Sequence, residues 1–127
     1  MSQVILELMV EDVAASIAFY RDILEFVLVA NEPDAAGKPY WALMRLGEFA
    51  LAFKEAARLK SEVPFLEGRE VGGSIAIVIE VDDLRARYAR VAERFGLLDH
   101  PHLTPCGTTQ FSLLDNSGYI VTYEQPG

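Results

Sequence analysis

Both histidines of the chain lie in one tripeptide, His100-Pro101-His102, so any imidazole chemistry must come from that segment. Their spacing could place both rings on one strand face, where Glu124 or Cys106 would complete a metal site. Two ligands from one loop are a weak signature, however, and a surface or edge position for both rings is the preferred interpretation. Cys106 would be reactive only beside a cationic group, and its preferred role is packing as a small residue.

Composition and charge limit the chemistry that these residues can serve. The chain has 127 residues, of which 51% are hydrophobic and 24% charged, which predicts a single domain over residues 1–127. Its 11 Lys and Arg against 19 Asp and Glu give a net charge of −8, which disfavours nucleic acid and membrane surfaces and favours cationic or neutral small ligands. One cysteine permits no internal disulfide, and without a secretory leader or a long apolar run we expect a cytoplasmic protein.

The first half of the chain predicts a strand, a helix and three further strands. Residues 4–10 alternate with period two, and Asp12 occupies an N-cap position before apolar residues at helical spacing over 13–24. Residues 26–30 have the composition of a strand. Two more strands, over 40–46 and 49–54, are expected to form a hairpin about Gly47-Glu48.

The second half repeats this order of elements. A strand rich in β-branched residues is expected over 74–81, a helix over 84–95 that Gly96 closes, and strands over 97–102, 108–114 and 119–125. Asp12 and Asp83 mark the same strand-to-helix junction 71 residues apart. We therefore predict an α+β fold of two βαβββ modules, 3–56 and 74–125, joined by a connector over 57–73. Their strands would form a cupped mixed sheet, within one chain or across a homodimer.

With these elements the sequence resembles the vicinal oxygen chelate superfamily, which includes glyoxalase I, extradiol dioxygenases, fosfomycin resistance enzymes and the bleomycin resistance proteins. The resemblance covers nearly the whole chain. Its most specific part is the segment 8–26, and further matches lie at 80–84, at 105–107 and from Phe111 into the turn at 115–118. The chain departs from the family pattern at Glu25, where Gly is frequent, at Cys106, where Trp is frequent, and in the sequence of that turn.

Metal-using members of the family are expected to carry four His, Glu or Gln ligands on the first and last strands of each module. There a divalent ion holds two neighbouring substrate oxygens and stabilises the charge that develops on them. The matching positions here are Ile5, Ala52, Ala76 and Thr122. Three apolar side chains and one hydroxyl are a poor donor set for a divalent ion, so we expect that this chain binds no metal and needs no cofactor.

Turn geometry predicts which side chains face the concave side of the sheet. The pairs expected from a two-residue turn at Gly47-Glu48 are Arg45–Ala50, Leu43–Ala52 and Trp41–Lys54. The pairs expected from a four-residue turn at 115–118 are Leu113–Ile120, Phe111–Thr122 and Thr109–Glu124. With strand alternation, the predicted ligand-binding residues are Glu7, Met9, Trp41, Leu43, Glu80, Phe111, Thr122 and Glu124.

Such a cleft, aromatic and aliphatic with scattered acids, suits a planar or apolar ligand that carries positive charge. We therefore expect a metal-independent binding protein similar to the bleomycin resistance proteins, a homodimer that sequesters a cationic or aromatic ligand without catalysis. In a structural interpretation, Trp41 and Phe111 belong to the core or to a dimer interface, and the three glutamates are solvated or paired.

Two other functions stay open from the sequence. One is a divergent metal-dependent lyase, isomerase or dioxygenase of the glyoxalase type, with ligands such as Glu7, Glu80, Glu124 or His100. The other is a regulatory domain or subunit that binds a protein partner and no small ligand.

Overall fold

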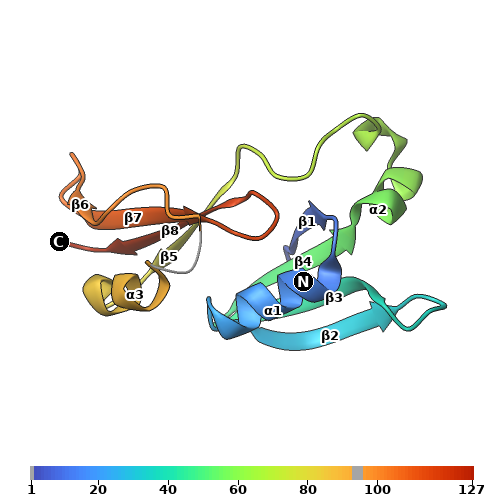
Figure 1. Cartoon of the computed structure of the whole chain (residues 1–127), viewed down its shortest axis with the longest axis horizontal. Coiled ribbons are helices and arrows are strands. Elements are labelled where there is room, and N and C mark those ends of the chain that lie inside the picture. The colour runs from blue at the N-terminus through green and yellow to red at the C-terminus, as the bar shows by residue number, and fades with distance from the viewer. Residues whose placement is uncertain (1, 93–95) are drawn as a thin grey trace. The chain divides into compact units, whose positions relative to one another are not determined.

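The computed structural model describes residues 2–92 and 96–127. It divides into two compact units, Met1–Gly72 (unit 1) and Gly73–Gly127 (unit 2), and each contains one four-stranded mixed sheet (Figure 1). The α+β class and the repeated βαβββ order expected from the sequence are confirmed. No helix within the described residues is long and apolar enough to cross a membrane.

Unit 1 follows the predicted order of elements. It contains β1 (Leu6–Val10), α1 (Val13–Asp22), β2 (Val27–Pro33), β3 (Pro39–Leu46) and β4 (Phe49–Glu55), and it continues through α2 (Ala56–Glu62) and a short 3-10 helix, η1 (Pro64–Leu66). The strand order is β1-β4-β3-β2, with β1 parallel to β4 and the other pairs antiparallel. The two helical segments α2 and η1 lie in the region that the sequence suggested only as a connector.

The core of unit 1 lies between α1 and one face of the sheet. Tyr20 of α1 is fully buried, and its ring centroid lies 4.7 Å from that of Phe53 and 5.3 Å from that of Phe26. On β3, Ala42 and Met44 are also fully buried, so the even-numbered residues of this strand pack beneath the helix. Trp41, Leu43 and Arg45 consequently point to the other face, which α1 does not cover.

Local hydrogen bonds fix where α1 begins and ends. Asp12 caps the start, because its Oδ1 accepts a hydrogen bond from the backbone N–H of Ala15 at 3.1 Å. At the other end Glu25 adopts a positive φ of 66°, and the N–H of Phe26 donates to the carbonyl of Tyr20 at 2.8 Å. This is the left-handed closure that glycine makes at lowest cost, and Glu25 is the position where the related family often has glycine.

Unit 2 has the same topology as unit 1. It contains β5 (Ala76–Glu80), α3 (Leu84–Val91), β6 (His102–Leu103), β7 (Thr109–Leu114) and β8 (Ile120–Gln125), in the order β5-β8-β7-β6. The Oδ1 atom of Asp83 caps α3 by accepting from the N–H of Ala86 at 3.1 Å, as Asp12 caps α1. The helix was predicted over 84–95. In the structure α3 ends at Val91, and the predicted helical residues 93–95 lie outside the described residues.

Two predictions about unit 2 were wrong. The strand expected over 97–102 is reduced to an isolated bridge between Leu97 and Leu113 and to the short β6. The register of β7 and β8 is also displaced by one residue, because the connecting loop runs over 115–119 and not 115–118. The carboxylate of Asp115 accepts from the N–H groups of Ser117 and Tyr119, which holds the longer loop closed.

Candidate functional site

The face of the unit 1 sheet that α1 leaves uncovered is here named the open face. The predicted hairpin register is confirmed, since Trp41 lies opposite Lys54, Leu43 opposite Ala52 and Arg45 opposite Ala50. Glu7 pairs with Ala52 and Met9 with Lys54 across the parallel strands β1 and β4. The residues of the open face on these three strands are Glu7, Met9, Trp41, Leu43, Arg45, Ala50, Ala52 and Lys54.

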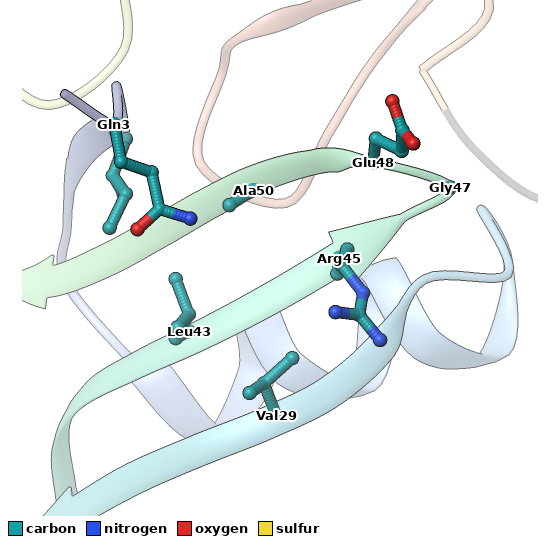
Figure 2. A pocket seen from close by; sticks show the side chains of 8 residues that line it. Gln3, Val29, Leu43, Arg45, Gly47, Glu48 and Ala50 are labelled. Atoms are coloured by element: carbon teal, nitrogen blue, oxygen red, sulfur yellow. The ribbon is translucent and has the colours of Figure 1, made fainter. Parts of the chain in front are cut away.

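A cavity of about 550 Å³ lies over the part of the open face nearest the β3–β4 turn (Figure 2). Its apolar lining comes from Ile5, Val29, Leu43 and Ala50, and its polar lining from Gln3, Arg45 and the turn residues Gly47 and Glu48. The volume lies within the range that small-molecule sites occupy, roughly 300–1,000 Å³. We name this space the β3–β4 cavity.

A register irregularity in β2 helps to form this cavity. Leu28 pairs with Met44 and Ala30 with Leu43, so Val29 is an extra residue between two paired positions. The Val29 side chain lines the cavity beside Leu43 and is 49% exposed. An apolar side chain with so much exposure at a concave surface is available to contact a ligand.

The end of the open face farther from the β3–β4 turn is polar and contacts α2. Lys54 Nζ lies 2.6 Å from Oε1 of Glu62, and only 18% of the Lys54 side chain is exposed. The hydrogen bond that Lys54 donates to Glu62 raises the pKa of Lys54, and the nearby charge of Glu7 acts in the same direction. The guanidinium of Arg58 lies 3.6 Å from the centre of the Tyr40 ring and adds a second contact between α2 and the sheet. The ammonium of Lys54 therefore offsets the negative charges of Glu62 and Glu7 at this end of the open face.

The corresponding face of unit 2 carries three of the other predicted residues. Glu80 and Glu124 are paired positions on β5 and β8, and Oε1 of Glu124 accepts from the Thr108 hydroxyl at 3.1 Å. Thr122 is 7% exposed, and its hydroxyl shares a hydrogen bond of 2.7 Å with that of Ser112. The polar contacts of Glu124 and Thr122 are thus made within unit 2, to Thr108 and Ser112.

Phe111 does not lie beside Thr122, as the expected register would require. It pairs with Tyr123, is fully buried, and makes an edge contact with Tyr88 of α3 at 5.2 Å between ring centroids. A shift of one residue in strand pairing turns every side chain to the opposite face, so the longer loop at 115–119 moves Phe111 from the open side to the helix side. Phe111 is part of the packing of unit 2.

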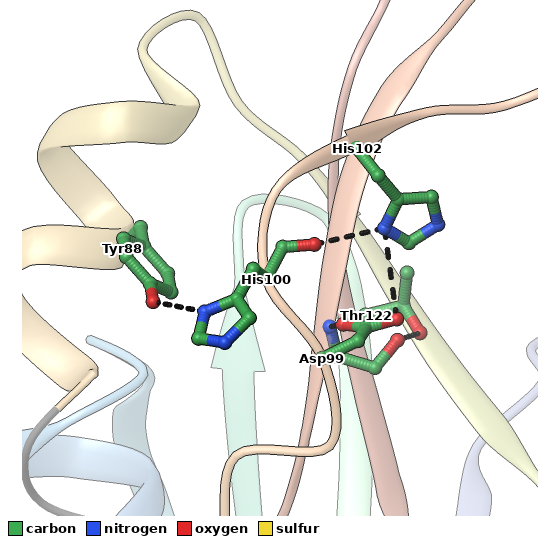
Figure 3. Close-up of polar contacts among 6 residues, drawn as sticks. Tyr88, Asp99, His100, His102 and Thr122 are labelled. Carbon is green, nitrogen blue, oxygen red and sulfur yellow. Dashed lines mark hydrogen bonds and ion pairs between the residues drawn. The ribbon is translucent and has the colours of Figure 1, made fainter.

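The two histidines belong to a chain of polar contacts (Figure 3). The Tyr88 hydroxyl lies 2.7 Å from Nδ1 of His100, and Nδ1 of His102 donates to the carbonyl of His100 at 2.8 Å. His102 also lies 3.7 Å from Asp99, whose other oxygen accepts from the N–H of Ser112 at 2.6 Å. Within residues 2–92 and 96–127, no group of three or more His, Cys, Asp or Glu side chains is arranged to hold a metal.

The positions that the family resemblance predicts for metal ligands do not fit a divalent ion. In unit 1, Ile5 and Ala52 offer no donor atom, and Ile5 lines the β3–β4 cavity. In unit 2, Ala76 offers none and the hydroxyl of Thr122 is engaged with Ser112. Hard divalent ions favour carboxylate, imidazole or carbonyl donors, and these four side chains supply none of them.

Comparison with known proteins agrees with this architecture. The model of the Glyoxalase/Bleomycin resistance protein/Dioxygenase superfamily matches residues 3–123, and the chain belongs to that superfamily. No curated protein sequence matches it.

Several solved structures share the fold. TnmS3, an antibiotic binding protein from Streptomyces sp. CB03234, is 26% identical with a TM-score of 0.72, and the match covers 100% of this chain and 98% of that one. TioX from Micromonospora sp. ML1 is 17% identical with a TM-score of 0.74, over 98% of both chains. A protein of unknown function from Agrobacterium tumefaciens str. C58 is 21% identical with a TM-score of 0.79, over 100% of this chain and 95% of that one.

The structure thus brings four of the predicted residues onto one surface. Glu7, Met9, Trp41 and Leu43 share the open face, but only Leu43 lines the β3–β4 cavity. The prediction omitted Arg45, although strand alternation from Leu43 already placed it on the same face. Gln3 and Val29 were also missed, since no motif in the sequence marks them.

Proposed function

We propose that this chain is a small-molecule-binding protein that works without a metal, and that the β3–β4 cavity is its ligand site. One observation carries the proposal: a cavity of about 550 Å³ with Ile5, Val29, Leu43 and Ala50 in its lining lies on the open face, and it includes Ile5, which the family resemblance predicts at a metal-ligand position. A site of this size and lining favours burial of an apolar ligand over polarisation of substrate oxygens. The antibiotic binding protein TnmS3, at 26% identity, supports the same class of function.

The proposed ligand is apolar or aromatic. Burial of apolar area against Ile5, Val29 and Leu43 would supply most of its binding free energy, at roughly 25 cal/mol per Å². A cationic ligand has less support, because the cavity lining carries one base, Arg45, beside one acid, Glu48, and so has no excess of negative charge. The charge of Glu7 on β1 acts on Lys54. Trp41 lies two residues before Leu43 on β3, on the same face. Its fluorescence would therefore respond to a ligand bound beside Leu43.

A fluorescence titration tests this function, because Trp41 is the only tryptophan of the chain. The purified protein would be titrated with a panel of planar aromatic compounds before and after treatment with a chelator. We expect saturable changes in Trp41 emission with one ligand per chain and the same affinity after chelation. Loss of binding on chelation, with recovery on addition of Ni, Mn, Fe or Zn, would favour a metal-dependent enzyme of the glyoxalase type.

We also propose that the protein is a homodimer. The outer edges of β1 and β2 are edges of the unit 1 sheet, and exposed strand edges favour pairing or coverage by another chain. Val4 is 89% exposed and Val27 62%, which adds apolar surface near those edges. Sedimentation equilibrium is expected to give twice the chain mass of 14.1 kDa, and a monomer at all concentrations would contradict the proposal.

A further inference from the structure

Arg45 is the basic residue of the β3–β4 cavity. One residue, Leu46, separates it from the turn residues Gly47 and Glu48. Its side chain extends from the open face, because Ala42 and Met44, at the even positions of β3, are buried beneath α1. In Figure 2 the guanidinium reaches toward the strand that carries Val29. The residue opposite Arg45 on β4 is Ala50, whose methyl group leaves the guanidinium uncovered.

No acidic side chain neutralises this cation within residues 2–92 and 96–127, where Arg45 forms no ion pair. Glu48 also lines the cavity, but its carboxylate points away from the Arg45 guanidinium (Figure 2). By contrast, Lys54 on the same face is paired with Glu62. The cavity therefore combines an apolar lining from Ile5, Val29, Leu43 and Ala50 with a guanidinium that forms no ion pair within the described residues.

A guanidinium is suited to a particular kind of ligand group. Its planar set of donors matches the two oxygens of a carboxylate, and hydrogen bonds between charged partners are stronger than neutral ones. Gln3 also lines the cavity, at the end opposite Arg45 in Figure 2, and its amide can pair with a neutral polar group of the same ligand.

We propose that the β3–β4 cavity binds small apolar or aromatic molecules that carry a carboxylate or an equivalent anionic oxygen pair, and that Arg45 binds this group. The proposal rests on the proposed function and names its ligand class. The ligand's apolar body packs against Ile5, Val29 and Leu43, and its anionic end points to the β3–β4 turn. The net charge of −8 then repels such ligands at long range, while Arg45 selects them at contact.

Calorimetric titration with three probes of one shape tests the inference: naphthoate, naphthamide and naphthylmethylammonium. We expect naphthoate to bind most tightly to the unaltered chain. Arg45→Gln should weaken naphthoate about 10- to 100-fold and leave naphthamide nearly unchanged, since one charged hydrogen-bond partner is lost. Arg45→Lys should give an intermediate loss, because it keeps the charge without the planar donors.

Arg85→Gln is the matched control, because it removes the same charge from an exposed position on α3. It should leave all three affinities unchanged. If naphthoate binds no tighter than the other probes, or if both Gln variants weaken it equally, the inference is overturned while small-molecule binding stands. If none of the three probes binds, the proposed function and the inference fail together.

Discussion

Leu43 on β3 and Ala52 on β4 lie directly opposite each other on the open face of unit 1. Ala52 is 1% exposed, and its methyl group offers no donor at a position that the family resemblance predicts for a metal ligand. Beside it, Leu43 turns the larger side chain toward the β3–β4 cavity. This pair makes the surface apolar at the point where a metal enzyme would need charge and lone pairs.

Leu43→Glu is expected to weaken ligand binding strongly without unfolding the chain. The substitution removes apolar contact and forces a ligand to desolvate a carboxylate, which should cost at least about tenfold in affinity. Leu43 is only half-buried, so the thermal midpoint should change little. Calorimetry with the tightest aromatic ligand measures the effect.

The control for this variant is Leu98→Glu, which places the same charge on a leucine that is 51% exposed in unit 2. It should bind the ligand as the unaltered chain does. Equal loss of affinity in both variants would show that added charge, and not the cavity, decides binding.

Phe111→Ala is expected to destabilise the fold by about 3–5 kcal/mol, because it removes a fully buried ring from contact with Tyr88 and Tyr123. Denaturant unfolding measures this loss. Thr122→Val, at the position where Phe111 was expected to pair, should cost much less, since it replaces one hydroxyl whose partner is Ser112. A small effect of Phe111→Ala on unfolding would contradict the observed register of β7 and β8.

Glu25→Gly is expected to stabilise the chain by about 0.5–1 kcal/mol, because relief of the left-handed conformation exceeds the added entropy of the unfolded state. The φ of 66° at Glu25 is the reason. The thermal midpoint should rise by about 2–5 °C. Glu11→Gly is the control at an exposed glutamate without positive φ, and it should be neutral or destabilising. A fall in stability for Glu25→Gly would contradict the backbone geometry.

Lys54→Met is expected to lower stability by about 0.5–1 kcal/mol near neutral pH, since its partner Glu62 is 47% exposed and solvent weakens the pair. Folding raises the pKa of Lys54 above its ordinary value of 10.5 through the hydrogen bond with Glu62. Its contribution is therefore complete below pH 10.5 and decreases as the pH rises through the higher folded value.

Urea unfolding of both proteins at a series of pH values measures this difference, which should shrink only in alkaline solution. Lys38→Met, at an exposed lysine in a loop, should show no such difference at any pH. A gap between Lys54→Met and the unaltered chain that persists unchanged into strongly alkaline solution would contradict the role of the ammonium charge.

Local sequence signals predicted the elements with short-range causes. The caps Asp12 and Asp83 define the helix starts, and Gly47-Glu48 defines the β3–β4 register, because each depends on a few neighbouring residues. The turn after β7 was different. There the Asp115 carboxylate closes a loop one residue longer than expected, and this single residue moved Phe111 to the other face.

The candidate site was predictable only in part for the same reason. Trp41 and Leu43 followed from alternation on a hairpin of known register. Val29 reaches the cavity through a bulge in β2, and Gln3 lies outside any strand, so neither position follows from periodicity. The concave shape arises from segments far apart in the chain, which a local pattern does not encode.

We propose above that the β3–β4 cavity binds its ligand without a metal. Calorimetry would compare the affinity of the tightest aromatic ligand before chelation, after chelation and after reloading with Zn, Ni, Mn or Fe, with metal content measured on each sample. We predict one ligand per chain and an unchanged dissociation constant in all three states. A stoichiometric metal whose removal abolishes binding, and whose return restores it, would contradict the account.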